Sequence, residues 1–321
     1  MRFYGFQDYY ERTQMNFKMK IVLLPLVIAW TCQGCKQGAP TTNAKLQGDD
    51  FTKGTTLFAA DESFSPIVDE ELYIFKALFK EAKPVITYKP ESQVLNMLLN
   101  DSVRVAILSR SLDTAEINLF KRRTLPADIN KFAVDAVALI VNHASADTTT
   151  SVKEIIAMLN GKAKTDKSIV FDNPNSSLVR YLKQLSGTID LKQKNIYALK
   201  SNKDVINYVS THPNSIGIVG FAWLNDPDTD YAAAVDKVKI MGVKDENNKK
   251  TPNEYFKPSQ TTLVQHTYPL SRSLYIIDCT GKKGLGAGFA SFLKSERGQR
   301  IILKSGLLPD SIPQREINIV H

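Results

Sequence analysis

Residues 169–185, IVFDNPNSSLVRYLKQL, combine a short strand, a polar turn and an amphipathic helix. The strand is the apolar run 169–171, and the turn formers of residues 172–175 end it. From Ser177 onward apolar side chains recur at the spacing of one helix face. These side chains are Leu178, Tyr181, Leu182 and Leu185.

The start of this helix has two interpretations. Asn175, Ser176 and Ser177 stand where free backbone N–H groups and the positive end of the helix dipole attract an anion. Small hydroxyl side chains would add donors there. A side chain of Asn175 or Ser176 that simply caps the helix is the more common explanation of such a pattern in isolation. The rest of the chain has to decide between a binding site and a cap.

Strands alternate with helices along most of the chain, which is typical of an α/β architecture. The strand over 103–108 is apolar almost throughout, as a parallel strand buried on both faces would be. The predicted strands are 55–59, 85–88, 103–108, 132–141, 169–171, 196–199, 216–221, 237–243 and 268–278. The predicted helices are 65–79, 94–100, 113–123, 152–159, 177–185, 202–209 and 284–303.

Length and charge bound the class of protein. The chain has 321 residues, enough for about two domains, and a formal net charge of +8. Its lysines are spread along the sequence, and the densest basic cluster is the short run 121–123. A nucleic-acid-binding protein would concentrate this charge on one face. We therefore expect no nucleic-acid partner and a surface mildly favourable to anionic ligands.

The N-terminal segment predicts export and a lipid anchor. Two lysines precede the apolar run 21–28, which is too short to span a bilayer comfortably. The run is followed by Cys32-Gln33-Gly34-Cys35, which is similar to a bacterial lipobox and predicts lipid attachment at Cys35. A conventional cleaved signal peptide or an uncleaved anchor is the alternative. Residues 1–35 are thus a signal segment, and the polar residues 36–50 a flexible tether. The remaining cysteine, Cys279, is expected to be a small buried residue.

Three segments together resemble the phosphate-binding proteins of ABC importers. They are Ser63-Phe64 before the first helix, the helix start at 175–177, and the C-terminal block 268–309. That block begins YPLSRSLYIID and continues, over 289–309, as FASFLKSERGQRIILKSGLLP, and it is the most specific of the three. The resemblance covers roughly residues 55–309, with the elements in the family's order.

The resemblance implies a type II periplasmic-binding fold, in which two α/β lobes with mostly parallel sheets are joined by two crossing strands. Lobe 1 would comprise residues 51–138 and 244–312, and lobe 2 residues 139–243. The strands 132–141 and 268–278 would be the crossings, and the ligand would lie between the lobes. It also implies a periplasmic, membrane-anchored monomer that works with ABC permease subunits.

The family's phosphate donors match this chain in part. Ser63 and Phe64 match the hydroxyl residue and phenylalanine at the first helix start. Glu91 or Ser92 occupies the place of the family's second-loop serine. The family's third strand ends in an aspartate that accepts the ligand's proton, whereas Ser109 follows the strand here.

The helix start carries the second departure from the family. Asn175, Ser176 and Ser177 replace a Ser-Gly-Thr run, and the arginine that precedes it in the family is missing near Phe171. We therefore expect Arg110 to supply the cation and Glu91 the carboxylate, since a guanidinium matches a tetrahedral oxyanion. A surface salt bridge at Arg110 and a solvated loop carboxylate at Glu91 are the alternatives.

The leading functional prediction is non-catalytic capture of phosphate or a related oxyanion for import, with no cofactor and no metal. A lipid-anchored binding or sensory protein of the same fold with another ligand is the main alternative. A secreted hydrolase is the weaker one, because the four histidines show no metal-binding spacing and no G-x-S-x-G motif is present.

Overall fold

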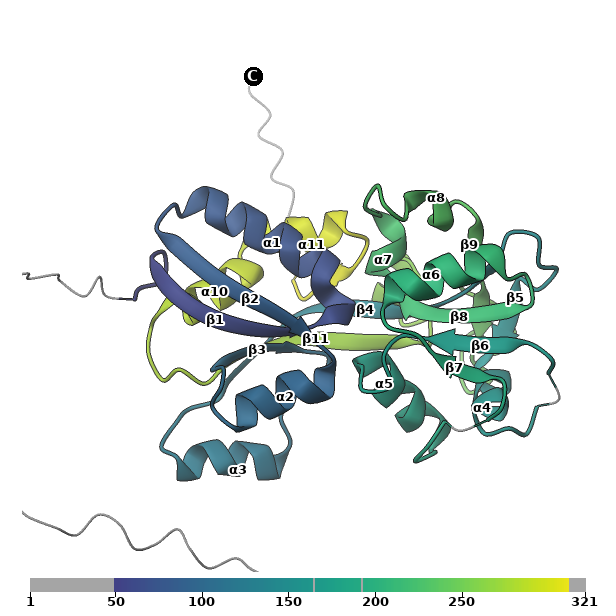
Figure 1. Cartoon of the computed structure of the whole chain (residues 1–321), viewed down its shortest axis with the longest axis horizontal. Coiled ribbons are helices and arrows are strands. Elements are labelled where there is room, and N and C mark those ends of the chain that lie inside the picture. Colours follow the sequence, from purple (N-terminus) through teal and green to yellow (C-terminus); the bar gives the residue numbers. More distant parts are fainter. Residues whose placement is uncertain (1–48, 164, 192, 312–321) are drawn as a thin grey trace, which may run out of the picture. The chain divides into compact units, whose positions relative to one another are not determined.

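A ten-stranded mixed sheet organises the described part of the chain, with strand order β2-β1-β3-β11-β4-β8-β6-β7 and with β9 and β12 paired to β4 (Figure 1). The computed structural model describes residues 49–311 except residues 164 and 192. The predicted signal segment, the lipidation site at Cys35 and all but the end of the tether lie outside these residues. The strands of the sheet are β1 (Gly54–Asp61), β2 (Ala82–Lys89), β3 (Val105–Leu108), β4 (Asp128–Asn142), β6 (Ser168–Phe171), β7 (Ile196–Ala198), β8 (Ser215–Gly220), β9 (Val238–Ile240), β11 (Ser271–Asp278) and β12 (Leu308–Pro309).

The pairing divides this sheet into two parallel halves with an antiparallel centre. In the first half, β1 is parallel to β2 and β3; in the second half, β6 is parallel to β7 and β8. Between them, β11 is antiparallel to β3 and β4, and β4 is antiparallel to β8. The predicted α/β fold with two strands crossing between the halves is confirmed. A separate two-stranded sheet contains β5 (Thr149–Ser151) and β10 (Gly242–Lys244).

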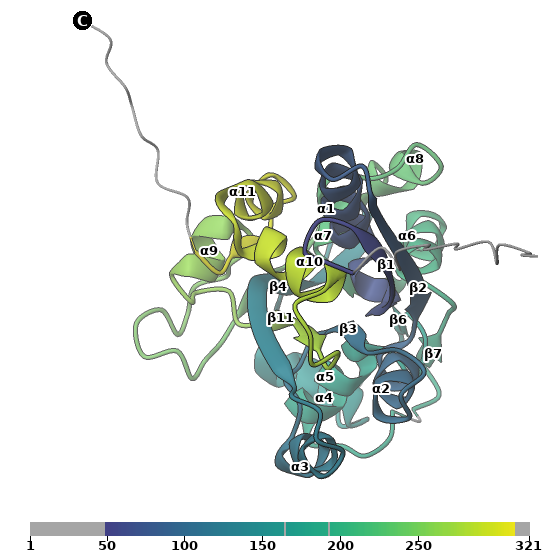
Figure 2. The same ribbon diagram turned by 90° about the vertical axis from the view of Figure 1, so that its left-hand side faces the viewer.

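Helices cover both faces of each half. In the first half, α1, α10 and α11 pack on one face of the sheet, and α2 and α3 on the other (Figure 2). In the second half, α4 and α5 cover one face, and α6, α7 and α8 the other. The helices are η1 (Glu62–Phe64), α1 (Ser65–Leu78), α2 (Glu91–Leu99), α3 (Thr114–Arg122), α4 (Val152–Leu159), α5 (Ser177–Ser186), α6 (Asn202–Thr211), α7 (Ala222–Asn225), α8 (Ala232–Val235), α9 (Gln260–Val264), α10 (Leu285–Lys294) and α11 (Glu296–Lys304).

The cores follow from the alternation of side chains along buried strands. In β1, Phe58 and Ala60 join the core beneath α1, whereas Ala59 joins the core beneath α2. In β8, Gly217 permits close packing, because a Cβ atom there would lie 2.7 Å from Val209 of α6. Cys279 is a free, buried cysteine in the core beneath α2, as expected.

The packing bears on the predicted lobe boundaries. Leu263, Tyr268 and Leu270 belong to the core of the second half, together with residues of α4 and α5. The sequence prediction assigns residues 244–312, and with them these three, to lobe 1. In the structure, these three side chains pack in the second half. The first-half core resumes with Leu274 of β11.

Two predicted elements are each divided in the structure. The predicted strand 237–243 is two short strands, β9 and β10, which pair with β4 and β5 respectively. The predicted helix 284–303 is two helices, because Ser295 adopts an extended conformation and its hydroxyl caps α11 by accepting from Gly298 N. Ahead of the predicted helix 65–79 the structure has a short turn, η1, which Asp61 caps by accepting from Ser63 N.

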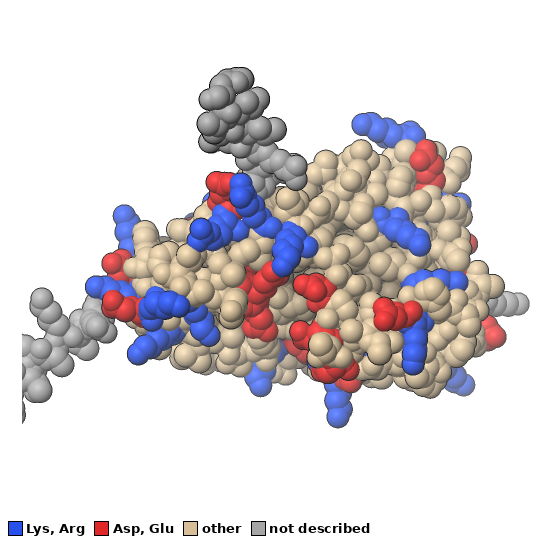
Figure 3. Space-filling view, turned by 90° about the horizontal axis from the view of Figure 1, so that it is seen from above, with Lys and Arg blue, Asp and Glu red and all other residues tan. Residues whose placement is uncertain are grey.

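On the face shown in Figure 3, charged side chains of both signs are interspersed rather than gathered in one stripe. The face in Figure 3 shows lysine and arginine side chains across its whole width, with aspartate and glutamate among them. Among the described residues, no helix is both long and apolar enough to cross a membrane.

Candidate functional site

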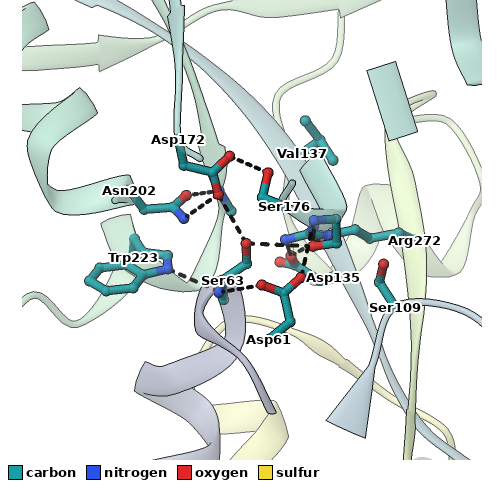
Figure 4. Close-up of polar contacts among 12 residues, drawn as sticks. Asp61, Ser63, Ser109, Asp135, Val137, Asp172, Ser176, Asn202, Trp223 and Arg272 are labelled. Carbon is teal, nitrogen blue, oxygen red and sulfur yellow. Dashed lines mark hydrogen bonds and ion pairs between the residues drawn. The ribbon is translucent and has the colours of Figure 1, made fainter. Parts of the chain in front are cut away.

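Segments far apart in the sequence bring polar side chains together between the two halves (Figure 4). β1 ends at Asp61 and runs into η1, which carries Ser63. β6 ends at Phe171, and the loop after it carries Asp172 and leads to the N-terminus of α5. Arg272 comes from the crossing strand β11. The carboxyl ends of parallel strands from both halves therefore meet here, which is where open α/β sheets bind ligands.

The carboxylate of Asp172 is held by donors from both halves. Asn202 Nδ2 donates to Asp172 Oδ2 at 3.1 Å, and Ser63 Oγ donates to the same oxygen at 3.2 Å. Ser176 Oγ donates to the other oxygen. The side chain is buried, and this burial, together with the charge of Asp61, raises the pKa of Asp172 to about 7 against the opposing effect of the hydroxyl donors.

The carboxylate of Asp61 accepts backbone N–H groups from two helix starts. Its Oδ1 accepts from Ser63 N at 3.1 Å, and its Oδ2 accepts from Ser177 N at 3.2 Å. Ser63 lies in η1 and Ser177 begins α5, so this buried carboxylate joins the halves. Burial, and then the charge of Glu91, raise the pKa of Asp61, while Arg272 opposes the rise. Backbone N–H groups at helix starts are, in general, good donors to an anion.

Arg272 supplies the positive charge at this place. Its Nε and Nη2 donate to Asp135 Oδ2 at 3.0 and 2.9 Å, which makes a cross-strand ion pair between β11 and β4. Its Nη1 donates to Ser177 Oγ at 2.6 Å, and its guanidinium lies over the ring of Phe64, 4.6 Å from the centroid. Both charged side chains are at most 2% exposed. Burial raises the pKa of Asp135, and the charge of Arg272 opposes that rise.

We call these buried groups the central cluster. It comprises Asp61, Ser63, Phe64, Asp135, Asp172, Ser176, Ser177, Asn202 and Arg272.

A second group, the edge network of Glu91, Ser109 and Arg180, also joins the halves. Ser109 Oγ donates to Glu91 Oε2 at 2.6 Å and accepts from Arg180 Nη2 at 2.6 Å. Arg180 of α5 also pairs directly with Glu91, which begins α2. Burial alone would raise the pKa of Glu91, but the hydrogen bonds and charge of Arg180, with those of Ser109, hold it below its usual range. In the edge network, the negative charge of Glu91 is therefore balanced by Arg180 within the chain.

Two contacts beside these groups also bridge the halves. Trp223 of α7 donates its Nε1 hydrogen to the carbonyl oxygen of Ser63 at 3.0 Å. Ser92 N donates to the carbonyl oxygen of Asn175 at 3.2 Å. Ser92 and Asn175 are therefore neighbours, but both residues are exposed and this contact uses only their backbones.

The predicted site residues are brought together in part. Ser63, Phe64, Ser176 and Ser177 lie in the central cluster, and Glu91 and Ser109 in the edge network. Arg110 lies outside the central cluster. Its guanidinium pairs with Glu116 of α3 and donates to the carbonyl oxygen of Ser111 at 2.7 Å. The cation that contacts Ser177 is Arg272.

Sequence reasoning missed several members of the central cluster. Asp61 and Asp172 each lie at the polar end of an apolar run, a position that is typical of ordinary loop and turn residues. Asp135 lies inside the apolar run 132–141. Opposite charges at Asp135 and Arg272, each within a predicted crossing strand, were the available signal for a buried pair. Asn202 and Arg180 gave no comparable signal, because polar residues at helix starts and on helix faces are ordinary.

Known proteins share both the sequence pattern and this architecture. The chain matches the sequence profile of the PBP superfamily domain over residues 46–297. The chain belongs to the PBP superfamily. It is 25% identical over 266 residues to the phosphate-binding protein PstS of Borreliella burgdorferi, an alignment that covers 76% of this chain and 86% of that protein. It is 29% identical over 247 residues to PstS of Staphylococcus aureus, covering 71% of this chain and 69% of that protein.

Solved structures extend the comparison to the fold. A putative phosphate ABC transporter substrate-binding protein with bound phosphate from Clostridium perfringens superposes with a TM-score of 0.67 at 17% identity, covering 80% of this chain and all of that chain. An ABC-type phosphate transport receptor from Vibrio cholerae superposes with a TM-score of 0.60 at 18% identity, covering 79% of this chain and 99% of that chain. These superpositions agree with the type II periplasmic-binding fold.

Proposed function

We propose that this protein is an extracytoplasmic solute-binding protein that captures phosphate, or a related oxyanion, between two lobes and delivers it to ABC permease subunits. Membership of the PBP superfamily supports the class of function, and the relatives named PstS support the ligand. Such a protein binds its ligand without changing it, so the role is not enzymatic.

The observation that carries this proposal is the convergence of donors on one buried point. Backbone N–H groups of Ser63 and Ser177 both point at the carboxylate of Asp61, and Arg272 contacts the Ser177 hydroxyl beside them. A tetrahedral oxyanion at this point would receive the same two N–H groups, the neighbouring serine hydroxyls and the guanidinium. Donors from both halves would then close around it.

The lobes, the anchor and the assembly are part of the same proposal. Lobe 1 comprises the first-half strands with α1, α2, α3, α10 and α11, and lobe 2 the second-half strands with α4 to α8. Core packing supports a return to lobe 1 at β11 rather than at residue 244. We propose further that Cys35 carries a lipid that holds the monomeric protein at the outer side of the membrane.

The test is calorimetric titration of the whole protein, freed of bound anions by unfolding and refolding, with phosphate, arsenate and sulfate. Arg272→Gln removes the buried guanidinium, and Arg110→Gln is the matched control because Arg110 is a paired, half-buried arginine outside the central cluster. We expect phosphate binding to weaken about tenfold or more in Arg272→Gln and to be unchanged in Arg110→Gln. Ser177→Ala, which leaves the ion pair with Asp135 intact, should also weaken binding.

The reverse pattern would place the ligand at Arg110, as the sequence alone suggested. Absence of heat and of any thermal shift with all three anions would remove phosphate and its analogues as ligands.

One observation favours the second candidate, a binding or sensory protein with a different ligand. Three buried aspartates, Asp61, Asp135 and Asp172, surround the single guanidinium of Arg272 in the central cluster. This surplus of carboxylates suits a ligand that donates hydrogen bonds or carries positive charge. Thermal-shift screening of amino acids and polyamines beside the oxyanions would separate the two candidates.

A further inference from the structure

The two N–H groups that would bind an oxyanion already have an anionic partner within the chain. Asp61 accepts from Ser63 N at 3.1 Å and from Ser177 N at 3.2 Å, so one carboxylate bridges both helix starts. Its side chain is buried, and it lies at the end of β1, whose position the pairing with β2 and β3 fixes. An ordinary helix cap would serve one helix, whereas this carboxylate serves two helices from opposite halves.

We propose that Asp61 is an internal competitor for the bound anion, so that an oxyanion enters the central cluster only when Asp61 gives up these N–H groups by taking a proton. This inference rests on the proposed function. It deepens it by assigning to one residue the coupling between anion binding and proton uptake. The protonated side chain keeps its place but no longer satisfies both N–H groups as a carboxylate does.

The charges that face Asp61 explain why a proton is required. Glu62 follows it in η1, Glu91 faces it from α2, and Asp172 faces it from the loop after β6. Against these carboxylates stands Arg272 from β11, which is itself paired with Asp135 of β4, while Arg180 is paired with Glu91. An added oxyanion beside ionised Asp61 and Asp172 would therefore meet like charges in a buried place.

The same surroundings favour proton uptake by the buried carboxyl group of Asp61. Burial raises the pKa of both Asp61 and Asp172, so that a proton is available to these carboxyl groups without unfolding. Lower pH weakens the internal competitor, and anion affinity rises. Sulfate and phosphate differ here, because phosphate can itself carry a proton into the cluster and sulfate cannot.

The test compares the whole wild-type protein with Asp61→Asn, a substitution that keeps the shape and removes the charge. Phosphate affinity is measured by calorimetry at about pH 6 and about pH 8. Titration in buffers of different ionisation enthalpy gives the protons taken up on binding. We expect Asp61→Asn to bind phosphate about tenfold more tightly at the higher pH, to take up fewer protons and to lose most of its pH dependence.

Asp278→Asn is the matched control. Asp278 is likewise a buried aspartate at a strand end that accepts a backbone N–H, from Thr280 at 2.7 Å, but it is outside the central cluster. This variant should keep the wild-type affinity and proton uptake. Circular dichroism and thermal unfolding show whether each variant is folded, and the proton uptake of the wild-type protein tests the inference without any substitution.

The outcomes separate the inference from the proposed function. Weaker phosphate binding in Asp61→Asn would mean that Asp61 accepts a proton from the ligand. The proposed role of Asp61 as an internal competitor would then be wrong, while the proposed function would stand. Equal affinity and equal proton uptake in both proteins would also overturn this role. If neither protein binds phosphate, arsenate or sulfate, the proposed function and the inference fail together.

Discussion

The central cluster and the edge network both join the two halves of the protein, but their charges are balanced in opposite ways. In the edge network, Arg180 and Ser109 satisfy Glu91 and hold its pKa below the usual range. In the central cluster, burial dominates and raises the pKa of Asp61, Asp135 and Asp172. The first arrangement is compensated within the chain and can hold the halves together. The second holds several carboxyl groups with raised pKa values, an arrangement that is typical of functional sites.

The largest expected effect is on stability, and it tests whether the cation of the central cluster is structural as well as ligand-binding. Arg272→Gln leaves Asp135 buried without its partner, and breaking such a pair costs about 3–5 kcal/mol. Denaturant unfolding of the variant should show this loss, whereas Arg180→Gln should lose less, because Arg180 is 27% exposed. The double variant Asp135→Asn/Arg272→Gln should recover part of the stability. An Arg272→Gln protein as stable as the wild type would contradict the buried pair.

The pH dependence of stability should distinguish the two regions by sign. For Asp172, the pKa of about 7 in the folded protein lies above its ordinary value of 3.8. The folded state then binds more protons than the unfolded state. The contribution of Asp172 to the free energy of unfolding is therefore complete at low pH and is lost as the pH rises from about 4 to about 7. For Glu91 the pKa is lowered, so its contribution is present above the ordinary value of 4.5 and is lost as the pH falls through the folded-state pKa.

Free energies of unfolding measured between about pH 3 and about pH 8 check both signs. Asp172→Asn should remove a slope of at most about 1.4 kcal/mol per pH unit between about pH 4 and about pH 7, and Glu91→Gln should remove the loss of stability at acid pH. If the slope between these pH values persists in Asp172→Asn, another carboxylate of the central cluster carries it.

The edge network should affect how long the ligand stays bound rather than whether it binds. Arg180→Gln removes the ion pair that links α5 to α2, so the ligand should dissociate about tenfold faster with little change in association. Stopped-flow fluorescence can follow this, because Trp223 bridges the halves at Ser63. Glu91→Gln should have a similar effect, and the double variant should be no worse than either single one. Additive effects would mean that the two side chains act separately.

The contrast between the regions also explains what the sequence could reveal. Alternating apolar strands and amphipathic helices predicted the α/β fold, and the helix start at Ser176 and Ser177 predicted one side of the central cluster. The family resemblance, rather than local pattern, drew attention to Glu91 and Ser109, which hydrogen-bond to each other in the structure. Sequence reasoning did not identify Arg272, because the opposite charges of Asp135 and Arg272 in the two crossing strands only hint at a pair, and the register between β11 and β4 is needed to place them side by side. Arg110 pairs with Glu116 in the structure, and proximity in sequence to Ser109 could not tell which way its guanidinium points.

The smallest predicted effect separates helix capping from ligand binding, the two interpretations of the α5 start. Ser176 and Ser201 are matched N-cap residues in the second half: Ser176 Oγ accepts from Val179 N at 3.2 Å, and Ser201 Oγ accepts from Asp204 N at 3.1 Å. Replacing either with alanine should cost about 1 kcal/mol of stability. Only Ser176 also donates to Asp172 in the central cluster, so only Ser176→Ala should weaken phosphate binding in calorimetry. Equal binding by both variants would make Ser176 a cap and nothing more, and the anion would then depend on Ser177 and Arg272.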